Sequence, residues 1–148
     1  MIPGTRESPP GLDRRLQSFT LVPSVLIVDD EPNQRRALSI SLRLEGFEVA
    51  CAGTAMEALE VLRTTVVDVA LIDLMMPGVN GLDLARQMRT LHPSVPVVLT
   101  SAYHLSERQL ARADAGVVGF VPKPCPMADV AAFLHAKVRS SAARTPAA

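Results

Sequence analysis

Three aspartates, two hydroxyl residues and a lysine follow four apolar runs of the chain, and together they suit binding of a metal ion and a phosphate group. Asp29 and Asp30 follow the first run, Asp73 a later one, then Thr100 and Ser101, and finally Lys123. Carboxylates that share a shallow crevice repel each other by about 4 kcal/mol per close pair at an effective dielectric near 20. A divalent cation such as Mg²⁺ relieves this repulsion and also accepts phosphate oxygens. These residue types therefore favour chemistry on oxygen-rich anions over acyl transfer.

Alternating strand and helix patterns predict the elements that position these side chains. The apolar runs are short, mostly continuous and rich in β-branched residues, which is typical of strands buried on both faces of a parallel sheet. They are Val25–Val28, Glu48–Cys51, Val66–Ile72, Val95–Leu99 and Val117–Val121. Predicted helices begin at Pro32, at the capping box Thr54–Glu57, at Asn80-Gly81, at the capping box Ser106–Gln109 and at Met127. Gly46, His92-Pro93, Gly116 and a position near Arg139 mark helix ends.

This alternation predicts an α/β fold, a three-layer αβα sandwich built from right-handed βαβ units. In such sheets ligands bind outside the carboxyl ends of the strands, where the strand order reverses. The polar residues that follow the apolar runs are therefore expected to meet at one edge of the sheet.

Length and composition indicate one ordinary globular domain between two polar ends. The chain has 148 residues, of which 48% are hydrophobic and 20% charged, as in a typical single domain. Residues 1–22 are predicted to form a flexible leader, residues 23–140 the domain and residues 141–148 a flexible tail. Fifteen basic residues balance fifteen acidic ones, which argues against a broad surface for nucleic acid or anionic membranes.

Targeting signals and metal-ligand spacings are also missing from the sequence. No apolar run approaches the roughly 20 residues that cross a bilayer, and the N-terminus lacks a secretory signal, so a cytoplasmic location is expected. Cys51 and Cys125 lie far apart and are predicted to be buried free thiols rather than a disulfide or a metal site. The three histidines have no ligand spacing, which argues against a histidine metal site.

Four short motifs resemble the signatures of bacterial response-regulator receiver domains, the CheY-like family. They are Leu26–Glu31, Asp73–Gly78, Leu99–Ala102 and Lys123-Pro124, in this order along the chain. The resemblance covers about residues 24–139, nearly everything between the two ends, and the separations between the motifs agree with those of the family. It implies a flavodoxin-like fold with a five-stranded parallel sheet in strand order 2-1-3-4-5.

The resemblance also implies a role for each acid and for the lysine. Asp73 matches the aspartate that takes a phosphoryl group from a phosphohistidine of a partner. Asp30 matches a direct ligand of Mg²⁺ or Mn²⁺ and Asp29 the acid that holds metal-bound water, while Asp73 itself and the backbone carbonyl of Met75 match further ligands. Lys123 matches the lysine that pairs with the phosphoryl group. A carboxylate is a poor nucleophile unless its target is positioned and its charge offset, so the metal and the lysine belong to the chemistry.

Three further positions match the switch of the family. Ser101 matches the switch hydroxyl; Thr100 competes for the role, but neighbouring strand residues point to opposite faces, and the small Ala102 that follows favours Ser101. Phe120 matches the switch aromatic and, lacking a hydroxyl, would report the signal through packing. Pro124 matches a proline that follows a cis peptide bond.

The implied protein is a phosphorylation-dependent switch rather than an enzyme, catalysing only its own phosphoryl transfer and dephosphorylation. Its expected partners are a sensor histidine kinase or phosphotransfer protein and an unidentified downstream protein, without direct contact to nucleic acid or membrane. A homodimer through the fourth helix, fifth strand and fifth helix is a further expectation. Since no output domain follows the last helix, a single-domain regulator and the receiver portion of a longer protein both remain open.

Two other classes compete with this interpretation. A phosphatase of the haloacid-dehalogenase type needs a second acid two residues after its nucleophile, where this chain has Met75. A phosphorylation-independent interaction module would keep the fold alone, yet every expected site residue is present here. Taken singly, Asp29 or Asp30 would suit a helix cap and Asp73 a turn. Their joint placement after separate strands favours the switch.

Overall fold

The short apolar runs of the chain form the strands of one parallel sheet. The computed structural model describes residues 22–78, 80–102 and 116–144. The strands are β1 (Ser24–Val28), β2 (Glu48–Ala52), β3 (Val69–Asp73), β4 (Val97–Ser101) and β5 (Val117–Pro122). They pair in the order β2-β1-β3-β4-β5, and each pairing is parallel. The strand order places the change in winding direction between β1 and β3, where ligands of such sheets bind.

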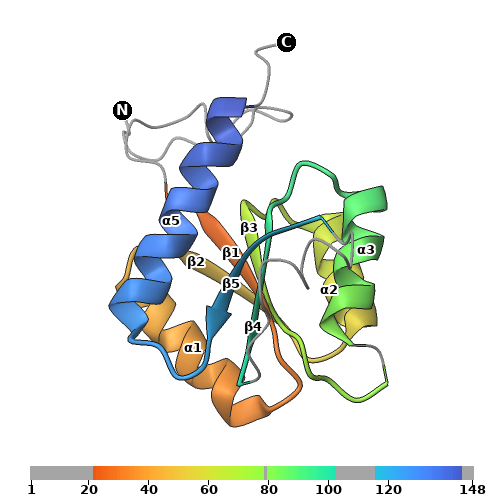
Figure 1. The fold of residues 1–148 in the computed structure, drawn as a ribbon, viewed down its shortest axis with the longest axis horizontal. Helices are drawn as coiled ribbons and strands as arrows, with labels where there is room; N and C mark the ends of the chain where they lie inside the picture. Colours follow the sequence, from red (N-terminus) through yellow and green to blue (C-terminus); the bar gives the residue numbers. More distant parts are fainter. Residues whose placement is uncertain (1–21, 79, 103–115, 145–148) are drawn as a thin grey trace, which may run out of the picture.

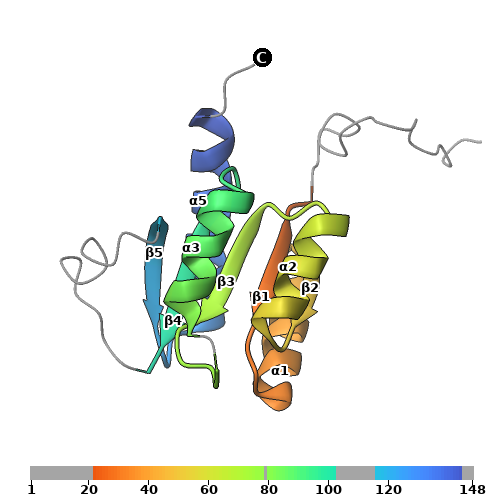
Figure 2. The ribbon, with the colours of Figure 1, turned by 90° about the vertical axis from the view of Figure 1, so that its right-hand side faces the viewer.

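Helices cover both faces of this sheet, as Figure 1 shows. The described helices are α1 (Pro32–Leu44), α2 (Ala55–Thr64), α3 (Gly81–Leu91) and α5 (Met127–Arg144). Residues of α2 and α3 pack into the apolar cluster on one face, and residues of α1 and α5 into the cluster on the other. In Figure 2, α2 and α3 lie in front of the sheet and α1 lies behind it. The three-layer αβα fold and its strand order, predicted from the sequence, are confirmed.

The position of each strand in the sheet explains its exposure. Every residue of β1, β3 and β4 is buried, in agreement with their continuous apolar sequences. The edge strand β2 is partly exposed. The prediction of two buried thiols is therefore wrong for Cys51, which is exposed on β2, while Cys125 is half-buried; both are free cysteines.

The predicted helix signals act at the expected places. Thr54 caps α2 by accepting a hydrogen bond from the Glu57 N–H, and Asn80 caps α3 through the Asp83 N–H. Gly46 follows the end of α1 with a φ of 98°, a conformation that glycine adopts without steric cost. The last helix continues to Arg144, beyond the Arg139 that its periodicity indicates.

Some sequence predictions concern residues outside the described ranges. The helix expected from Ser106 to Gly116 lies almost wholly among residues 103–115, and most of the leader and the end of the tail fall outside as well. Within the ranges that the structure describes, no helix is both long and apolar enough to cross a membrane.

A buried polar contact joins the start of β1 to the segment before β3, at the end of the sheet opposite to the predicted site. Asp68 Oδ2 accepts hydrogen bonds from Ser24 N–H at 2.8 Å and from Ser24 Oγ at 3.3 Å. Ser24 Oγ also donates to the carbonyl of Val66 at 2.8 Å. These contacts hold Val66 and Asp68 against the start of β1, so β3 begins at Val69 rather than at the Val66 that the apolar run predicts.

We predict that Asp68→Ala lowers the free energy of unfolding by about 1–3 kcal/mol, because the buried Ser24 N–H loses its acceptor. Urea denaturation measures this change. Glu60→Ala is the control, since Glu60 pairs with Arg63 on the exposed surface of α2, and it should change stability by no more than about 0.5 kcal/mol. Equal stability of the Asp68→Ala variant and the wild type would contradict this assignment.

Candidate functional site

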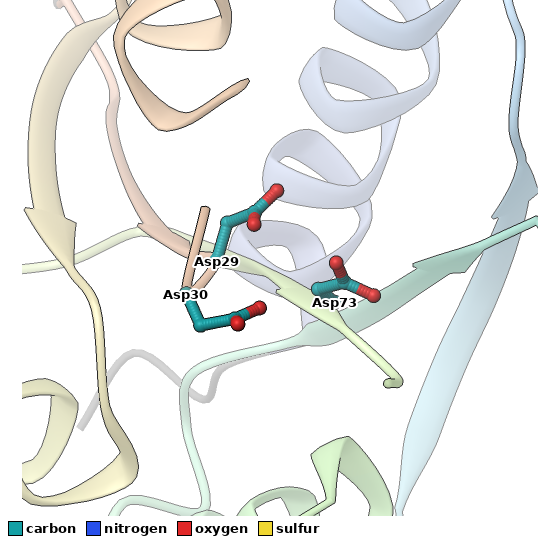
Figure 3. Close-up of side chains that lie close together, drawn as sticks. All are labelled: Asp29, Asp30 and Asp73. Atoms are coloured by element: carbon teal, nitrogen blue, oxygen red, sulfur yellow. The ribbon is translucent and has the colours of Figure 1, made fainter. Parts of the chain in front are cut away.

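Three carboxylates gather at the carboxyl ends of β1 and β3. Ligand oxygens of Asp29, Asp30 and Asp73 all lie within 4.8 Å of one another, and Figure 3 shows the three side chains grouped at this edge. Asp29 and Asp30 follow β1 directly, and Asp73 is the last residue of β3. Because β1 and β3 are parallel neighbours, the strand pairing itself brings these acids together. The predicted acidic cluster is therefore present.

The predicted lysine, Lys123, directly follows β5, and its side chain reaches this acidic cluster. Its backbone N–H donates to the carbonyl of Ser101 at 2.9 Å, which fixes the base of the side chain beside the end of β4. Lys123 Nζ then lies 3.2 Å from Asp73 Oδ2 and 3.8 Å from Asp29 Oδ2. The peptide bond between Lys123 and Pro124 is cis, as predicted. One ammonium group thus faces two of the three acids.

Burial disfavours the charged form of Asp29. Its side chain is buried, and burial raises its pKa above the ordinary value of 3.8. A hydrogen bond from the Glu31 N–H and the charge of Lys123 oppose this rise in pKa, whereas Asp73 and Asp30 add to it. Asp29 Oδ1 accepts the Glu31 N–H at 2.9 Å, but among the described residues the buried Asp29 Oδ2 has no hydrogen-bond partner. Such an atom is unfavourable unless a cation or donor satisfies it.

Glu31 caps α1, a role that either of the two preceding aspartates could have filled instead. Its carboxylate accepts hydrogen bonds from the backbone N–H groups of Asn33 at 2.8 Å and Gln34 at 3.0 Å. The alternative interpretation, in which Asp30 serves only as the cap of α1, is therefore wrong. Asp30 is instead exposed at the edge of the acidic cluster.

Asp73 has both a turn-forming and a site-forming contact. Its Oδ1 accepts the backbone N–H of Met75 at 3.0 Å, a local turn contact, while its Oδ2 faces Lys123. The Met75 side chain is exposed and brings no second acid to the site. The Met75 N–H thus fixes the orientation of the Asp73 carboxylate, leaving the other oxygen toward the lysine.

Two close backbone contacts support the loops that carry the acids. Arg35 Nη1 donates to the carbonyl of Asp29 at 2.7 Å and lies close to Gly53, where an added Cβ would come within 2.9 Å of it. At the start of α3, a Cβ on Gly81 would lie 2.7 Å from the carbonyl oxygen of Asp73. Gly81 therefore allows α3 to begin directly against the end of β3.

The predicted switch residues lie on the strands beside the cluster. Ser101 is buried at the end of β4, and strand alternation puts it on the sheet face of Leu99, which packs in the cluster of α2 and α3. Phe120 on β5 is partly buried and packs against the same apolar cluster of α2 and α3. It pairs in register with Leu99 on β4. Thr100 instead lines the groove between α1 and α5.

Sequence patterns did not single out Gln34, Arg35 or Gly81 as parts of the site. Gln34 Oε1 accepts a hydrogen bond from Lys123 Nζ at 3.0 Å, across 89 residues of sequence. Polar residues on an exposed helix face are common, so nothing in the local sequence separates Gln34 and Arg35 from ordinary solvated residues. Gly81 did mark the start of a helix, and only its packing reveals the contact with Asp73.

This arrangement suits an oxygen nucleophile beside positive charge. Asp73 offers a carboxylate oxygen toward the Lys123 ammonium, and the neighbouring acids offer hard oxygen ligands for a divalent cation. Phosphoryl groups carry the spread negative charge that such a site stabilises.

Comparisons with known proteins agree with this geometry. Residues 25–135 match the family model of the response regulator receiver domain. The probable transcriptional regulatory protein TcrX of Mycobacterium tuberculosis is 34% identical over 122 residues, which cover 82% of this chain and 52% of TcrX. The DNA-binding response regulator MtrA of Mycolicibacterium smegmatis is likewise 34% identical, over 81% of this chain and 52% of MtrA. The chain thus spans about half the length of these two relatives.

Solved structures give the same result for the fold. A CheY-like response regulator receiver domain protein from Methanospirillum hungatei superposes with a TM-score of 0.77 at 25% identity, covering 84% of this chain and all of that one. The response regulator TrrA of Thermotoga maritima, solved in complex with Mg²⁺–BeF, gives a TM-score of 0.69 at 28% identity over 78% of this chain and 98% of TrrA. The chain belongs to the family of response regulator receiver domains, the CheY-like signalling switches of two-component systems.

Proposed function

We propose that this receiver domain accepts a phosphoryl group on Asp73 from a phosphohistidine of a sensor histidine kinase or phosphotransfer protein. The observation that carries the proposal is the 3.2 Å contact between Asp73 Oδ2 and Lys123 Nζ beside two further carboxylates. In the reaction, a carboxylate oxygen of Asp73 bonds to phosphorus as the bond from phosphorus to the imidazole nitrogen breaks. The electron pair of that bond stays on the imidazole, and an aspartyl phosphate results.

Lys123 and Met75 have separate tasks in this step. The Met75 N–H holds Asp73 Oδ1, which limits rotation of the carboxylate. The Lys123 ammonium offsets the negative charge of the incoming phosphoryl oxygens, whose repulsion by three carboxylates would otherwise oppose approach. The Lys123 N–H donates to the carbonyl of Ser101, and this hydrogen bond fixes the backbone from which the charged side chain extends.

We also propose that the acidic cluster binds Mg²⁺, with Mn²⁺ as a substitute. The donor set fits: Asp29, Asp30 and Asp73 offer hard oxygens, and the buried Asp29 Oδ2 accepts no hydrogen bond within the part of the chain that the structure describes. Asp30 would bind the ion directly, Asp29 would hold its water, and the Met75 carbonyl would complete the protein ligands. When bound, the ion supplies positive charge opposite the phosphoryl oxygens.

Phosphorylation would act as a charge-triggered switch. It replaces a carboxylate by a group of about −1.5 to −2 charge with additional acceptor oxygens. Ser101 would then hydrogen-bond the phosphoryl group, and Phe120 would fill the space that Ser101 leaves. Moving an equilibrium from 1:99 to 99:1 takes about 5.5 kcal/mol, which a few charge-assisted hydrogen bonds of roughly 1.5–3 kcal/mol each supply.

The partners of the switch follow from this chemistry. A histidine kinase or phosphotransfer protein supplies the phosphoryl group, and an unidentified downstream protein reads the changed surface. That surface would comprise the fourth helix expected from Ser106 to Gly116, almost all of which lies outside the described residues, together with β5 and α5. The same face would serve a homodimer.

Neither competing class explains the site as well. A phosphatase of the haloacid-dehalogenase type lacks its second acid, since Met75 occupies that position. A phosphorylation-independent module would have no need for a lysine between Asp73 and Asp29, or for a buried carboxylate oxygen that accepts no hydrogen bond from the described residues.

We predict that Asp73→Asn abolishes phosphoryl uptake, because the amide lacks the nucleophilic carboxylate oxygen. Wild type incubated with acetyl phosphate and Mg²⁺ should gain the mass of one phosphoryl group in intact-protein mass spectrometry. Asp83→Asn is the matched control, because Asp83 is an exposed acid on α3 that pairs with Arg86. It should take up phosphate like the wild type, and equal uptake by the Asp73→Asn variant would refute the proposal.

We predict that Asp29→Asn stabilises the metal-free protein and removes its stabilisation by Mg²⁺. Because folding raises the pKa of Asp29, the contribution of Asp29 to stability should fall as pH rises from 3.8 through the raised pKa, and the penalty should persist above it, so the variant should gain stability relative to the wild type over this range. Asparagine does not ionise, so this dependence should disappear from the variant. Urea denaturation at several pH values measures it.

Mg²⁺ at 100 times its Kd should stabilise the wild type by about 2.7 kcal/mol and leave the Asp29→Asn variant nearly unchanged. Asp83→Asn again serves as the control and should respond like the wild type. Equal stabilisation of wild type and the Asp29→Asn variant by Mg²⁺ would show that Asp29 takes no part in the metal site.

A further inference from the structure

Of the hydrogen bonds that the Lys123 ammonium makes with described residues, the shortest is to a neutral amide. Lys123 Nζ lies 3.0 Å from Gln34 Oε1, compared with 3.2 Å from Asp73 Oδ2 and 3.8 Å from Asp29 Oδ2. The amide comes from α1, on a different element from the acids. The ammonium is therefore bound between an uncharged acceptor and the acidic cluster rather than wholly within the cluster.

Both ends of this hydrogen bond are anchored by backbone contacts. The Gln34 N–H donates to the capping carboxylate of Glu31, which fixes the first turn of α1. The Lys123 N–H donates to the carbonyl of Ser101, at the end of β4. The two side chains also line one groove of about 340 Å³ between α1 and the segment that follows β5. Gln34 can therefore hold the lysine tip at a defined place.

We propose that Gln34 is a positioning residue that keeps the Lys123 ammonium on the α1 side of Asp73 and out of the metal position. This inference rests on the proposed function. Without the amide acceptor, Lys123 Nζ would approach the nearest unsatisfied acceptor, the buried Asp29 Oδ2 at 3.8 Å. Charge-assisted bonds to carboxylates are stronger than bonds to neutral groups, so the ammonium would then occupy the Asp29 oxygen that is needed to hold the metal-bound water, and binding of the divalent cation would weaken.

The neutrality of Gln34 matters for the same reason. An amide oxygen accepts a hydrogen bond from the ammonium without cancelling its charge. The full charge of Lys123 thus remains available to the phosphoryl group when it arrives at Asp73. Gln34 acts through Lys123 alone, since no other contact of its side chain is needed for this effect.

The test compares Mg²⁺ binding by Gln34→Leu and wild type, using isothermal calorimetry without any phosphoryl donor. Leucine keeps the size and helix preference of glutamine but removes the acceptor. We expect the Kd for Mg²⁺ to rise about three- to tenfold, in the range of one lost hydrogen bond. Gln34→Ala should show the same rise, which guards against an effect specific to leucine.

Two comparisons separate positioning from a general structural effect. Asn33→Leu removes a neighbouring carboxamide on the other flank of α1, where Asn33 lines a groove with Arg36, and it should leave the Kd unchanged. In a Lys123→Ala background, Gln34→Leu should have no further effect on the Kd, because the lysine through which it acts is gone.

A wild-type Kd in the Gln34→Leu variant, or an equal rise of the Kd with and without Lys123, would overturn the proposal. Since Mg²⁺ binding is measured without phosphoryl transfer, these results are distinct from a failure of the proposed function. That failure would appear as absent phosphoryl uptake by the wild type itself.

Discussion

Mutual repulsion of three carboxylates held at one edge of the sheet is the constraint on which the rest of the structure depends. At 4.8 Å and an effective dielectric near 20, one such pair costs about 3.5 kcal/mol. The single ammonium of Lys123 offsets part of this cost but faces only Asp29 and Asp73. As far as the described residues go, the cluster is therefore short of positive charge, and this shortage makes it receptive to a cation and to a phosphoryl group brought with one.

The fold holds the cluster together in spite of this repulsion. Parallel pairing of β1 with β3 fixes the positions of the acids relative to one another along the strand direction. Both strands are buried along their whole length. Close approach of α3 through Gly81 supports the end of β3, while Arg35 binds the backbone at Asp29. Glu31 caps α1 and so leaves the preceding acids for the site. The apolar core thus supports an arrangement that is unfavourable locally, as is common at functional sites.

Strand and helix patterns predicted the parallel sheet, the caps at Thr54 and Asn80, and the meeting of the residues that follow the strands at one edge, because each depends on local sequence pattern. The resemblance to receiver domains added the strand order, which places Asp29, Asp30 and Asp73 side by side. The start of β3 was placed too early, since the Ser24–Asp68 contact is visible only in three dimensions. Cys51 was expected to be buried, but an edge strand leaves it exposed. Gln34 and Arg35 were missed because their partners lie on other elements or on the backbone, which no sequence spacing encodes.

Backbone amide chemical shifts during a Mg²⁺ titration test the central claim most directly. The Glu31 and Met75 N–H groups are bound to Asp29 Oδ1 and Asp73 Oδ1, so they report on the acidic cluster. The Ser24 N–H, bound to Asp68 at the opposite end of the sheet, is an internal reference. The account predicts saturable shifts at Glu31 and Met75 with none at Ser24. Unchanged signals at Glu31 and Met75, or shifts of equal size at all three, would contradict it.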